Sequence, residues 1–253
     1  MKVGLLTSNS LSDFRLKTID PIINDKLFTV ELAIIDDRPE KSLTEKLRSN
    51  IKRRRGAYIF ILALKSLLRR KNKAVQTKEY CQKNNIKFLE TRDPYSWEII
   101  DQIKHHNLDV LLLIGGYGIV KEPLLSAAPL GVLSYHHGNM RKYRGFPPAL
   151  WELYNNEKEM GVTVQILTAG LDCGIPIEEK TIEIRPTDNL KKLTDRAFIE
   201  SEDMMYAALK KLCNPEFRPA TIETFGQVYT LPNFREWMVL NAKILRRGIK
   251  SYF

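Results

Sequence analysis

Two adjacent histidines, His136 and His137, lie in residues 134–145 (SYHHGNMRKYRG) and are half of the four histidines in the chain. They follow a short apolar run, residues 131–135, which predicts a buried β-strand. Because side chains alternate along a strand, Ser134 and His136 share one face and His137 points to the other. An imidazole exchanges protons near neutral pH, so a histidine at the end of a parallel strand is well suited to proton transfer.

A histidine that moves protons usually needs an orienting carboxylate, and Asp172 is the candidate. It lies in TAGLDCG, a glycine-bounded loop that follows the predicted strand 162–167. A carboxylate beside the ring favours the charged form of the imidazole. The alternative is that Asp172 only supports a turn.

The composition is that of a globular α/β protein. With 253 residues, 43% of them hydrophobic, the chain can form one large domain or one domain with an appendage. The three cysteines form no C-x-x-C pair, which indicates neither a disulfide framework nor a zinc site and favours a reducing, cytoplasmic setting. The start, MKVGLLTS, predicts a strand rather than a signal peptide, and no apolar run approaches the ~18 residues that cross a bilayer. No metal is expected.

The positive charge is concentrated in one segment. The net charge is +10, and residues 46–73 contain eleven basic residues and no acidic residue. Removing those eleven from the 40 basic residues leaves 29, against 30 acidic residues. The near-neutral remainder disfavours nucleic acid as a partner.

The same segment has an apolar middle, AYIFILAL, between cationic ends. An amphipathic helix of this kind could lie peripherally on an anionic membrane surface. It could equally clamp a phosphorylated substrate or tRNA, contact a partner subunit, or pack in the core with solvated ends.

Short apolar runs alternate with longer amphipathic stretches, the pattern of a mostly parallel, Rossmann-like sheet with helices on both faces. The predicted strands are residues 2–7, 28–35, 87–90, 109–114, 131–135, 162–167 and 176–184. The predicted helices are residues 78–84, 96–106, 123–127, 148–156 and 190–212. The helical pattern breaks at NPEFRP (residues 214–219), so we expect a main domain over 1–215 and an extension over 216–253 that ends in a basic helix.

Residues 108–118, LDVLLLIGGYG, predict a central strand followed by a glycine-rich turn. Ligands of open α/β sheets bind beyond the carboxyl ends of the strands, where such turns lie. A tight turn without a ligand is the alternative. The chain has no Walker loop and no G-x-G-x-x-G, which disfavours nucleotide-driven and nicotinamide chemistry.

Four ordered motifs carry a family resemblance: GVLSYHHGNMRKYRG, PALW, GVTVQIL and GLDCGIPI. Together they resemble the formyltransferases that use 10-formyltetrahydrofolate, which include methionyl-tRNA, glycinamide ribonucleotide and sugar N-formyltransferases. The hallmark of that family is Asn-x-His at a strand end, then R-G-x-x-P, a G-V-T strand and an aspartate in a D-x-G loop. His136 and Asp172 match the family histidine and aspartate, and Arg144 and Gly145 match R-G. The resemblance implies the formyltransferase fold.

The chemistry of formyl transfer explains such residues. An amine attacks the formyl carbon, and the tetrahedral adduct carries negative charge on oxygen. His136 would donate to that oxygen, while Asp172 would help to move protons. Ser134 stands where the family has asparagine, so that donor contact is lost, bridged by water or supplied by another residue.

The resemblance also implies binding residues. A folate pocket is expected between the turn 114–118 and the loop 168–172. Its candidates are Leu113, Gly116, Leu171 and Asp172. Candidates for the second substrate are Ser8, Asn9 and Ser10, for which a polar loop with helix-capping serines is the alternative, and Arg144, which could instead steady its loop.

Three functions remain open. The first is folate-dependent N-formylation of a small amine, most plausibly an amino sugar attached to a nucleotide. The second is hydrolysis of formyltetrahydrofolate, with water in place of the amine. The third is folate binding without catalysis, because Ser134 replaces the family asparagine. The motifs do not identify the acceptor.

Overall fold

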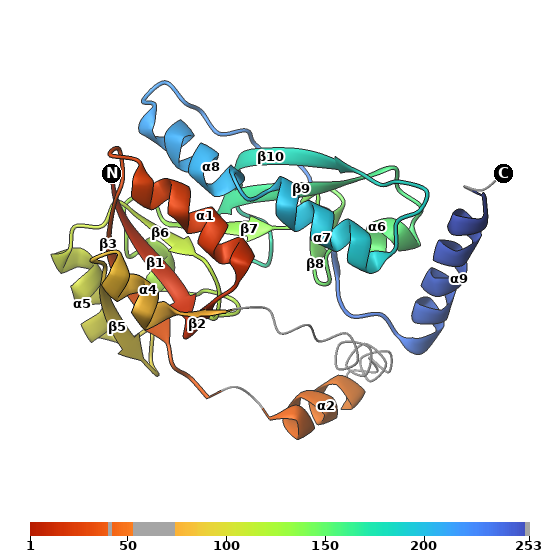
Figure 1. Cartoon of the computed structure of the whole chain (residues 1–253), viewed down its shortest axis with the longest axis horizontal. Helices are drawn as coiled ribbons and strands as arrows, with labels where there is room; N and C mark the ends of the chain where they lie inside the picture. Colours follow the sequence, from red (N-terminus) through yellow and green to blue (C-terminus); the bar gives the residue numbers. More distant parts are fainter. Residues whose placement is uncertain (40–41, 53–73, 251–253) are drawn as a thin grey trace.

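The computed structural model of the protein describes residues 1–39, 42–52 and 74–250. Within these ranges the centre is a seven-stranded sheet with the order β10-β9-β7-β6-β1-β3-β5 (Figure 1). The strands from β7 to β5 pair in parallel, and β9 and β10 pair antiparallel at one edge. The strands are β1 (Lys2–Ser8), β3 (Thr29–Asp36), β5 (Lys87–Thr91), β6 (Val110–Leu113), β7 (Val132–His136), β9 (Glu159–Ile166) and β10 (Ile175–Glu183). The predicted mostly parallel α/β fold is confirmed.

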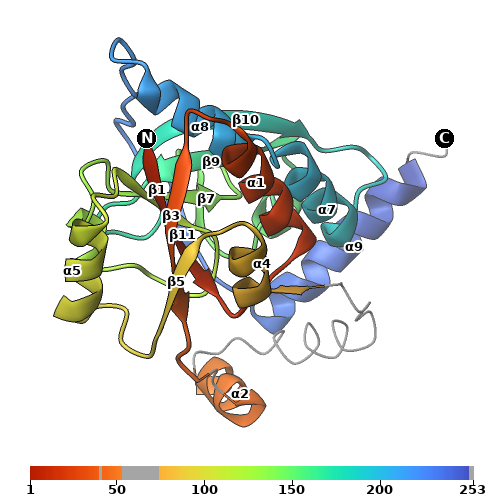
Figure 2. The same ribbon diagram turned by 60° about the vertical axis from the view of Figure 1, so that its left-hand side comes forward.

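Helices cover both faces of the sheet, because parallel strands need crossover connections. Figure 2 shows the sheet between α5 on one side and α1, α4 and α7 on the other. Ile19 and Ile22 of α1 belong to one buried apolar cluster, and Ile99, Ile100 and Ile103 of α5 belong to the other. The helices are α1 (Asp13–Asn24), α2 (Leu43–Lys52), α4 (Thr77–Lys83), α5 (Trp97–His105), α6 (Leu150–Tyr154), α7 (Leu190–Glu200), α8 (Met204–Cys213) and α9 (Phe234–Lys250).

The seven predicted strands are all present, with ends shifted by up to three residues. The central parts of β1, β3 and β6 are buried on both sides, as in β1, where residues 3–7 are all buried. The outer strands β5 and β10 are more exposed. A strand covered on both faces reads as a continuous apolar run, which is why the sequence located these elements well.

The prediction of one helix over residues 190–212 is wrong. The structure has two helices, α7 and α8, separated at residues 201–203. The side chain of Tyr135 in β7 stabilises this break. Its hydroxyl donates to Ser201 O at 2.7 Å and accepts from Met205 N at 3.0 Å. This contact comes from a distant strand, and the local sequence has no proline or glycine to signal it.

Two further corrections concern short helices. The predicted helix 123–127 is only a 3₁₀ turn, Leu124–Ser126. Conversely, the sequence analysis did not predict α1, which contains Pro21. Proline in a helix interior removes one backbone hydrogen bond, and the packing of Ile19 and Ile22 in the core offsets this loss.

The residues after 215 fold back onto the main body. Strand β11 (Gln227–Tyr229) of this extension pairs in parallel with β8 (Tyr143–Gly145). Elsewhere in the chain, the two-residue strands β2 (Ser10–Leu11) and β4 (Val75–Gln76) pair with each other. Helix α9, the expected basic helix, packs against α6. Trp151 Nε1 donates to Thr230 O at 2.9 Å, which ties the extension to α6.

Most of the basic segment 46–73 lies outside the described residues; only its first part, residues 46–52, belongs to α2. Among the described helices, none is long and apolar enough to cross a membrane.

Candidate active site

His136 ends β7 and is 6% exposed. Its Nε2 lies 2.8 Å from Tyr143 O, and its Nδ1 lies 3.4 Å from Asp172 Oδ2. Both ring nitrogens therefore face acceptors. A neutral imidazole has one N–H and satisfies one of them, whereas an imidazolium has two and satisfies both. The two acceptors fix the orientation of the ring at the end of β7.

Asp172 is fixed by the loop that contains β8. Its Oδ2 accepts from Gly145 N at 2.7 Å as well as facing His136. Arg144 of β8 also holds the loop of Asp172, because its Nε and Nη2 donate to Leu171 O at 3.0 and 2.8 Å. The Arg144 guanidinium also donates to Gly226 O at 3.3 Å, which supports the role of a loop brace that the sequence analysis left open.

Gly145 is the residue at which the loop that contains β8 contacts the C-terminal extension. Its φ is +93°, and a Cβ there would lie 2.1 Å from Tyr229 O of β11. We expect Gly145→Ala to lower the free energy of unfolding by about 1–3 kcal/mol through backbone strain and the clash. Gly118→Ala is the matched control, because Gly118 has φ +67° but no atom within 4 Å. Urea unfolding of both variants measures the difference, and equal losses would contradict the contact argument.

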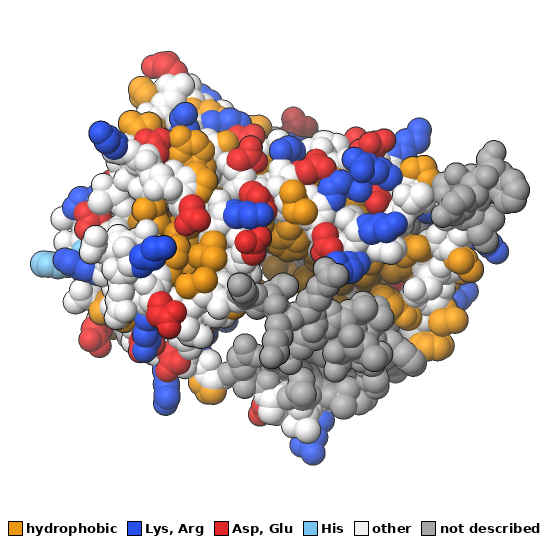
Figure 3. Space-filling model, in the orientation of Figure 1, with side chains coloured by type: hydrophobic (Ala, Val, Ile, Leu, Met, Phe, Trp, Pro, Cys, Tyr) orange, Lys and Arg blue, Asp and Glu red, His pale blue; other side chains and the backbone are white. Residues whose placement is uncertain are grey.

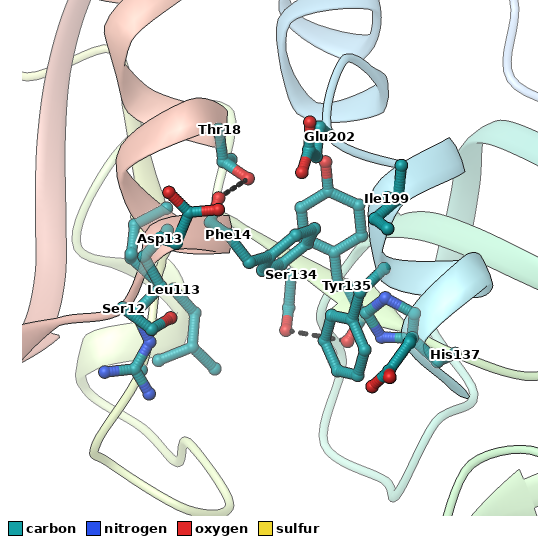
Figure 4. Close-up of a pocket in the computed structure, with 15 residues that line it drawn as sticks. Ser12, Asp13, Phe14, Thr18, Leu113, Ser134, Tyr135, His137, Ile199 and Glu202 are labelled. Atoms are coloured by element: carbon teal, nitrogen blue, oxygen red, sulfur yellow. Dashed lines mark hydrogen bonds between the residues drawn. The ribbon is translucent and has the colours of Figure 1, made fainter. Parts of the chain in front are cut away.

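A large cavity of about 690 Å³ is lined by Ser134 and Tyr135 of β7 and by His137. His136, whose ring faces Tyr143 O and Asp172, is not among its lining residues. Figure 4 shows its side chains between α1 and α7, with Phe14 and Tyr135 in its wall. On the face that carries α1, α7 and α8, apolar side chains reach the surface among acidic and basic ones (Figure 3). At this cavity Ile199 of α7 is 62% exposed.

His137 lines the large cavity and is held in an aromatic cluster. Its ring stacks on Tyr135 at 5.5 Å and lies 4.2 Å from Phe198, measured between ring centroids. Burial, followed by the charge of His136, lowers the pKa of His137 to about 3. His137 is therefore neutral near pH 7, and the two adjacent histidines have different environments.

The expected second-substrate residues Ser8, Asn9 and Ser10 are not among the residues that line the large cavity, and all three have hydrogen-bond partners within the protein. Arg15 Nη1 donates to Ser8 Oγ at 3.0 Å and to Ser10 O at 2.9 Å, and Asn9 Nδ2 donates to Asp37 Oδ1 at 3.0 Å. The cavity is lined instead by residues 12–15 at the start of α1. The sequence analysis missed these residues because it missed α1, although Ser12 followed by Asp13 is a recognisable helix start.

The expected folate residues lie in different places. Leu113 lines the large cavity, and Gly116, with φ +96°, lies in the turn beside the end of β1. The Leu171 side chain is 37% exposed, next to Asp172. In the described part of the chain, no group of three or more His, Cys, Asp or Glu residues could hold a metal ion.

The fold and the site thus define an α/β protein with a histidine and an aspartate paired beyond the carboxyl end of a central strand. The family model described as formyl transferase matches residues 41–209. The chain belongs to the formyl transferase family, as its motifs predicted.

A curated relative is the methionyl-tRNA formyltransferase of Trichormus variabilis, 27% identical over 132 residues, which are 52% of this chain and 40% of that protein. Another, from Caldanaerobacter subterraneus, is 30% identical over 61% of this chain and 52% of its own length. The match thus spans about half or less of these relatives.

The similar solved structures show the same fold. Glycinamide ribonucleotide transformylase 1 from Symbiobacterium toebii has a TM-score of 0.61 and 18% identity, covering 88% of this chain and 94% of its own. The Helicobacter canadensis N-formyltransferase, solved with folinic acid and dTDP-3-aminofucose, has a TM-score of 0.57 and 16% identity, covering 100% and 82%. A formyltetrahydrofolate deformylase from Pseudomonas syringae has a TM-score of 0.60 and 14% identity, covering 88% and 66%.

Proposed function

We propose that this protein transfers a formyl group from 10-formyltetrahydrofolate to the amine of a small substrate. The observation that carries the proposal is that His136, buried at the end of β7, faces Asp172 with one ring nitrogen and the Tyr143 carbonyl with the other. Membership of the formyl transferase family supplies the reaction class.

In the proposed reaction the amine nitrogen attacks the formyl carbon and forms the new C–N bond. His136, as imidazolium, redirects the hydrogen bond that Nε2 makes to the Tyr143 carbonyl and donates it to the formyl oxygen. This stabilises the negative charge that develops on that oxygen. Asp172 takes part in moving the proton that the amine loses. A proton is delivered to N10 of the folate as its C–N bond breaks, which leaves a formamide and tetrahydrofolate.

We propose the large cavity as the acceptor site. Its volume of about 690 Å³ is of the size that holds small ligands. The N-terminus of α1 lies at the cavity, because residues 12–15 line it. The first backbone amides of a helix have no intrahelical acceptor, and such amides are suited to bind a phosphate group. Phe14 and Tyr135 supply an aromatic wall for a base or sugar. A nucleotide-linked amino sugar has both features, as does the ligand named for the Helicobacter canadensis protein.

Two other outcomes are distinguished by the same assay. Protein is incubated with 10-formyltetrahydrofolate and separate pools of amino sugars linked to nucleotides, free amines and methionyl-tRNA. Formylated amine supports transfer and identifies the acceptor class. Free formate at the rate of folate consumption supports the hydrolase, and folate binding without turnover supports the non-catalytic reading.

Ser134→Asn tests what the serine contributes. Asparagine offers an N–H donor on a longer side chain, so we expect transfer at the wild-type rate or up to ~10²-fold faster. Ser134→Ala is the matched comparison, since it removes the hydroxyl without adding a donor. Steady-state kcat/KM for 10-formyltetrahydrofolate measures both. A large loss in Ser134→Asn would show that the serine is a specific adaptation.

Other expectations remain proposals. They are the division into residues 1–215 and 216–253, and the peripheral membrane contact through residues 46–73.

A further inference from the structure

Gln165 of β9 carries a buried hydrogen-bond donor that no described residue satisfies. The residue is 0% exposed, and its Oε1 accepts from Gly174 N at 2.9 Å. Because Gly174 N–H can only donate, the oxygen of the carboxamide must face it, and the NH₂ group must face elsewhere. In the described part of the chain Nε2 has no partner. Native proteins leave few buried donors unpaired, so this one calls for an acceptor.

The strand register places Gln165 directly across from Ser134. In the antiparallel pair β7 and β9, Ser134 faces Gln165 and His136 faces Thr163. Residues opposite each other share a face of the sheet, and so do alternate residues along a strand. Gln165 therefore lies on the face that carries Ser134 and His136. Through Gly174 it is also tied to the loop of Asp172.

The Ser134 hydroxyl has room for such a donor. It is 8% exposed and donates at 3.3 Å to Tyr135 O, the carbonyl of the next residue. A hydroxyl has one proton to give and two lone pairs to accept with, and it rotates to suit its partners. In the described part of the chain no donor bonds to the Ser134 hydroxyl oxygen, and Gln165 Nε2, on the residue directly opposite, donates to no acceptor. An N–H donated to the oxygen would leave the proton free to point at a ligand.

We propose that Gln165 is a positioning residue whose Nε2 amide donates to Ser134 Oγ and so aims the serine hydroxyl at the formyl oxygen. This inference rests on the proposed function. Ser134 would give the developing oxyanion a second hydrogen bond beside that of His136. The Gln165 amide would donate to the Ser134 hydroxyl, and the hydroxyl would donate to the oxyanion. The amide would thereby fix the direction of a donor that the short serine side chain does not fix alone.

A double-mutant cycle tests the coupling. Gln165→Met keeps the side-chain length without a donor, and it is combined with Ser134→Ala. We expect Gln165→Met to lower kcat/KM about tenfold when Ser134 is present and by less than about twofold when it is absent. A role limited to holding Gly174 would cost the same in both backgrounds, and that result would overturn the inference. Thermal unfolding of the four proteins checks that each is folded.

A second measurement does not depend on turnover. The side-chain amide of Gln165 is assigned in a ¹H–¹⁵N NMR spectrum as the signal missing from Gln165→Met. We expect slow hydrogen exchange of its protons in the wild type and a changed chemical shift in Ser134→Ala. An unchanged signal in Ser134→Ala would show that the amide does not bond the serine. If the wild type consumes no formyl-folate, the proposed function fails, and the NMR result still decides the pairing.

Discussion

Replacing His136 by alanine should lower the rate of formyl transfer by about 10²–10⁴-fold, the usual contribution of a positioned acid or base. Of the two adjacent histidines, His136 faces Asp172, whereas His137 is held in an aromatic cluster. Removal of the His136 ring takes away the proposed oxyanion donor and, among the described residues, leaves Gly145 N as the hydrogen-bond partner of Asp172. The rate of tetrahydrofolate release measures the effect.

His105→Ala is the control for this prediction. His105 is exposed at the end of α5, on another part of the molecule, and its replacement should leave the rate unchanged. Far-UV circular dichroism and thermal unfolding establish that both variants fold. If His136→Ala kept a rate within about threefold of the wild type, His136 would not be an acid or base of the reaction.

Glu152→Gln should change how stability depends on pH. Glu152 of α6 is 3% exposed and lines a small cavity with His136 and Trp151. Burial raises the pKa of Glu152 from 4.5 to about 7, and the negative charge of Glu157 adds to the rise. The folded protein therefore holds a proton that the unfolded chain releases, so the free energy of unfolding of the wild type falls as pH rises from about 4.5 to about 7.

Glutamine has the same shape and no charge to desolvate, so it should remove this decline. At about 1.4 kcal/mol for each pKa unit, the variant should gain up to about 3 kcal/mol over the wild type at pH 8 relative to pH 4. Urea unfolding at the two pH values measures the gain, and Glu98→Gln on the exposed side of α5 is the control. Parallel pH profiles for Glu152→Gln and wild type would contradict a buried, protonated carboxyl.

The sequence predicted the sheet mainly because its central strands, such as β1 and β6, are buried on both faces and leave continuous apolar runs. It predicted the pairing of His136 with Asp172 because those residues stand in motifs that resemble a known family. It did not predict the cavity, whose walls come from α1, β7 and α7 together. Helix α1 contains Pro21, which locally disfavours a helix, and the break between α7 and α8 is stabilised by the Tyr135 hydroxyl. Contacts between distant elements leave no local signal in the sequence.

The role of Gln165 shows the same limit. Its position within GVTVQIL identified only a strand residue, and a glutamine in a strand carries no specific signal. Only the register of β9 on β7 and the hydrogen bond to Gly174 reveal a buried amide with a free donor opposite Ser134.

The most direct test of the account is the fate of the formyl group. Wild-type protein is incubated with 10-formyltetrahydrofolate and nucleotide-linked amino sugars, and formylated sugar, formate and tetrahydrofolate are quantified together. We expect formylated amine and tetrahydrofolate in equal amounts, with both lost in His136→Ala. Undiminished 10-formyltetrahydrofolate with every acceptor offered, or equal turnover by wild type and His136→Ala, would contradict it.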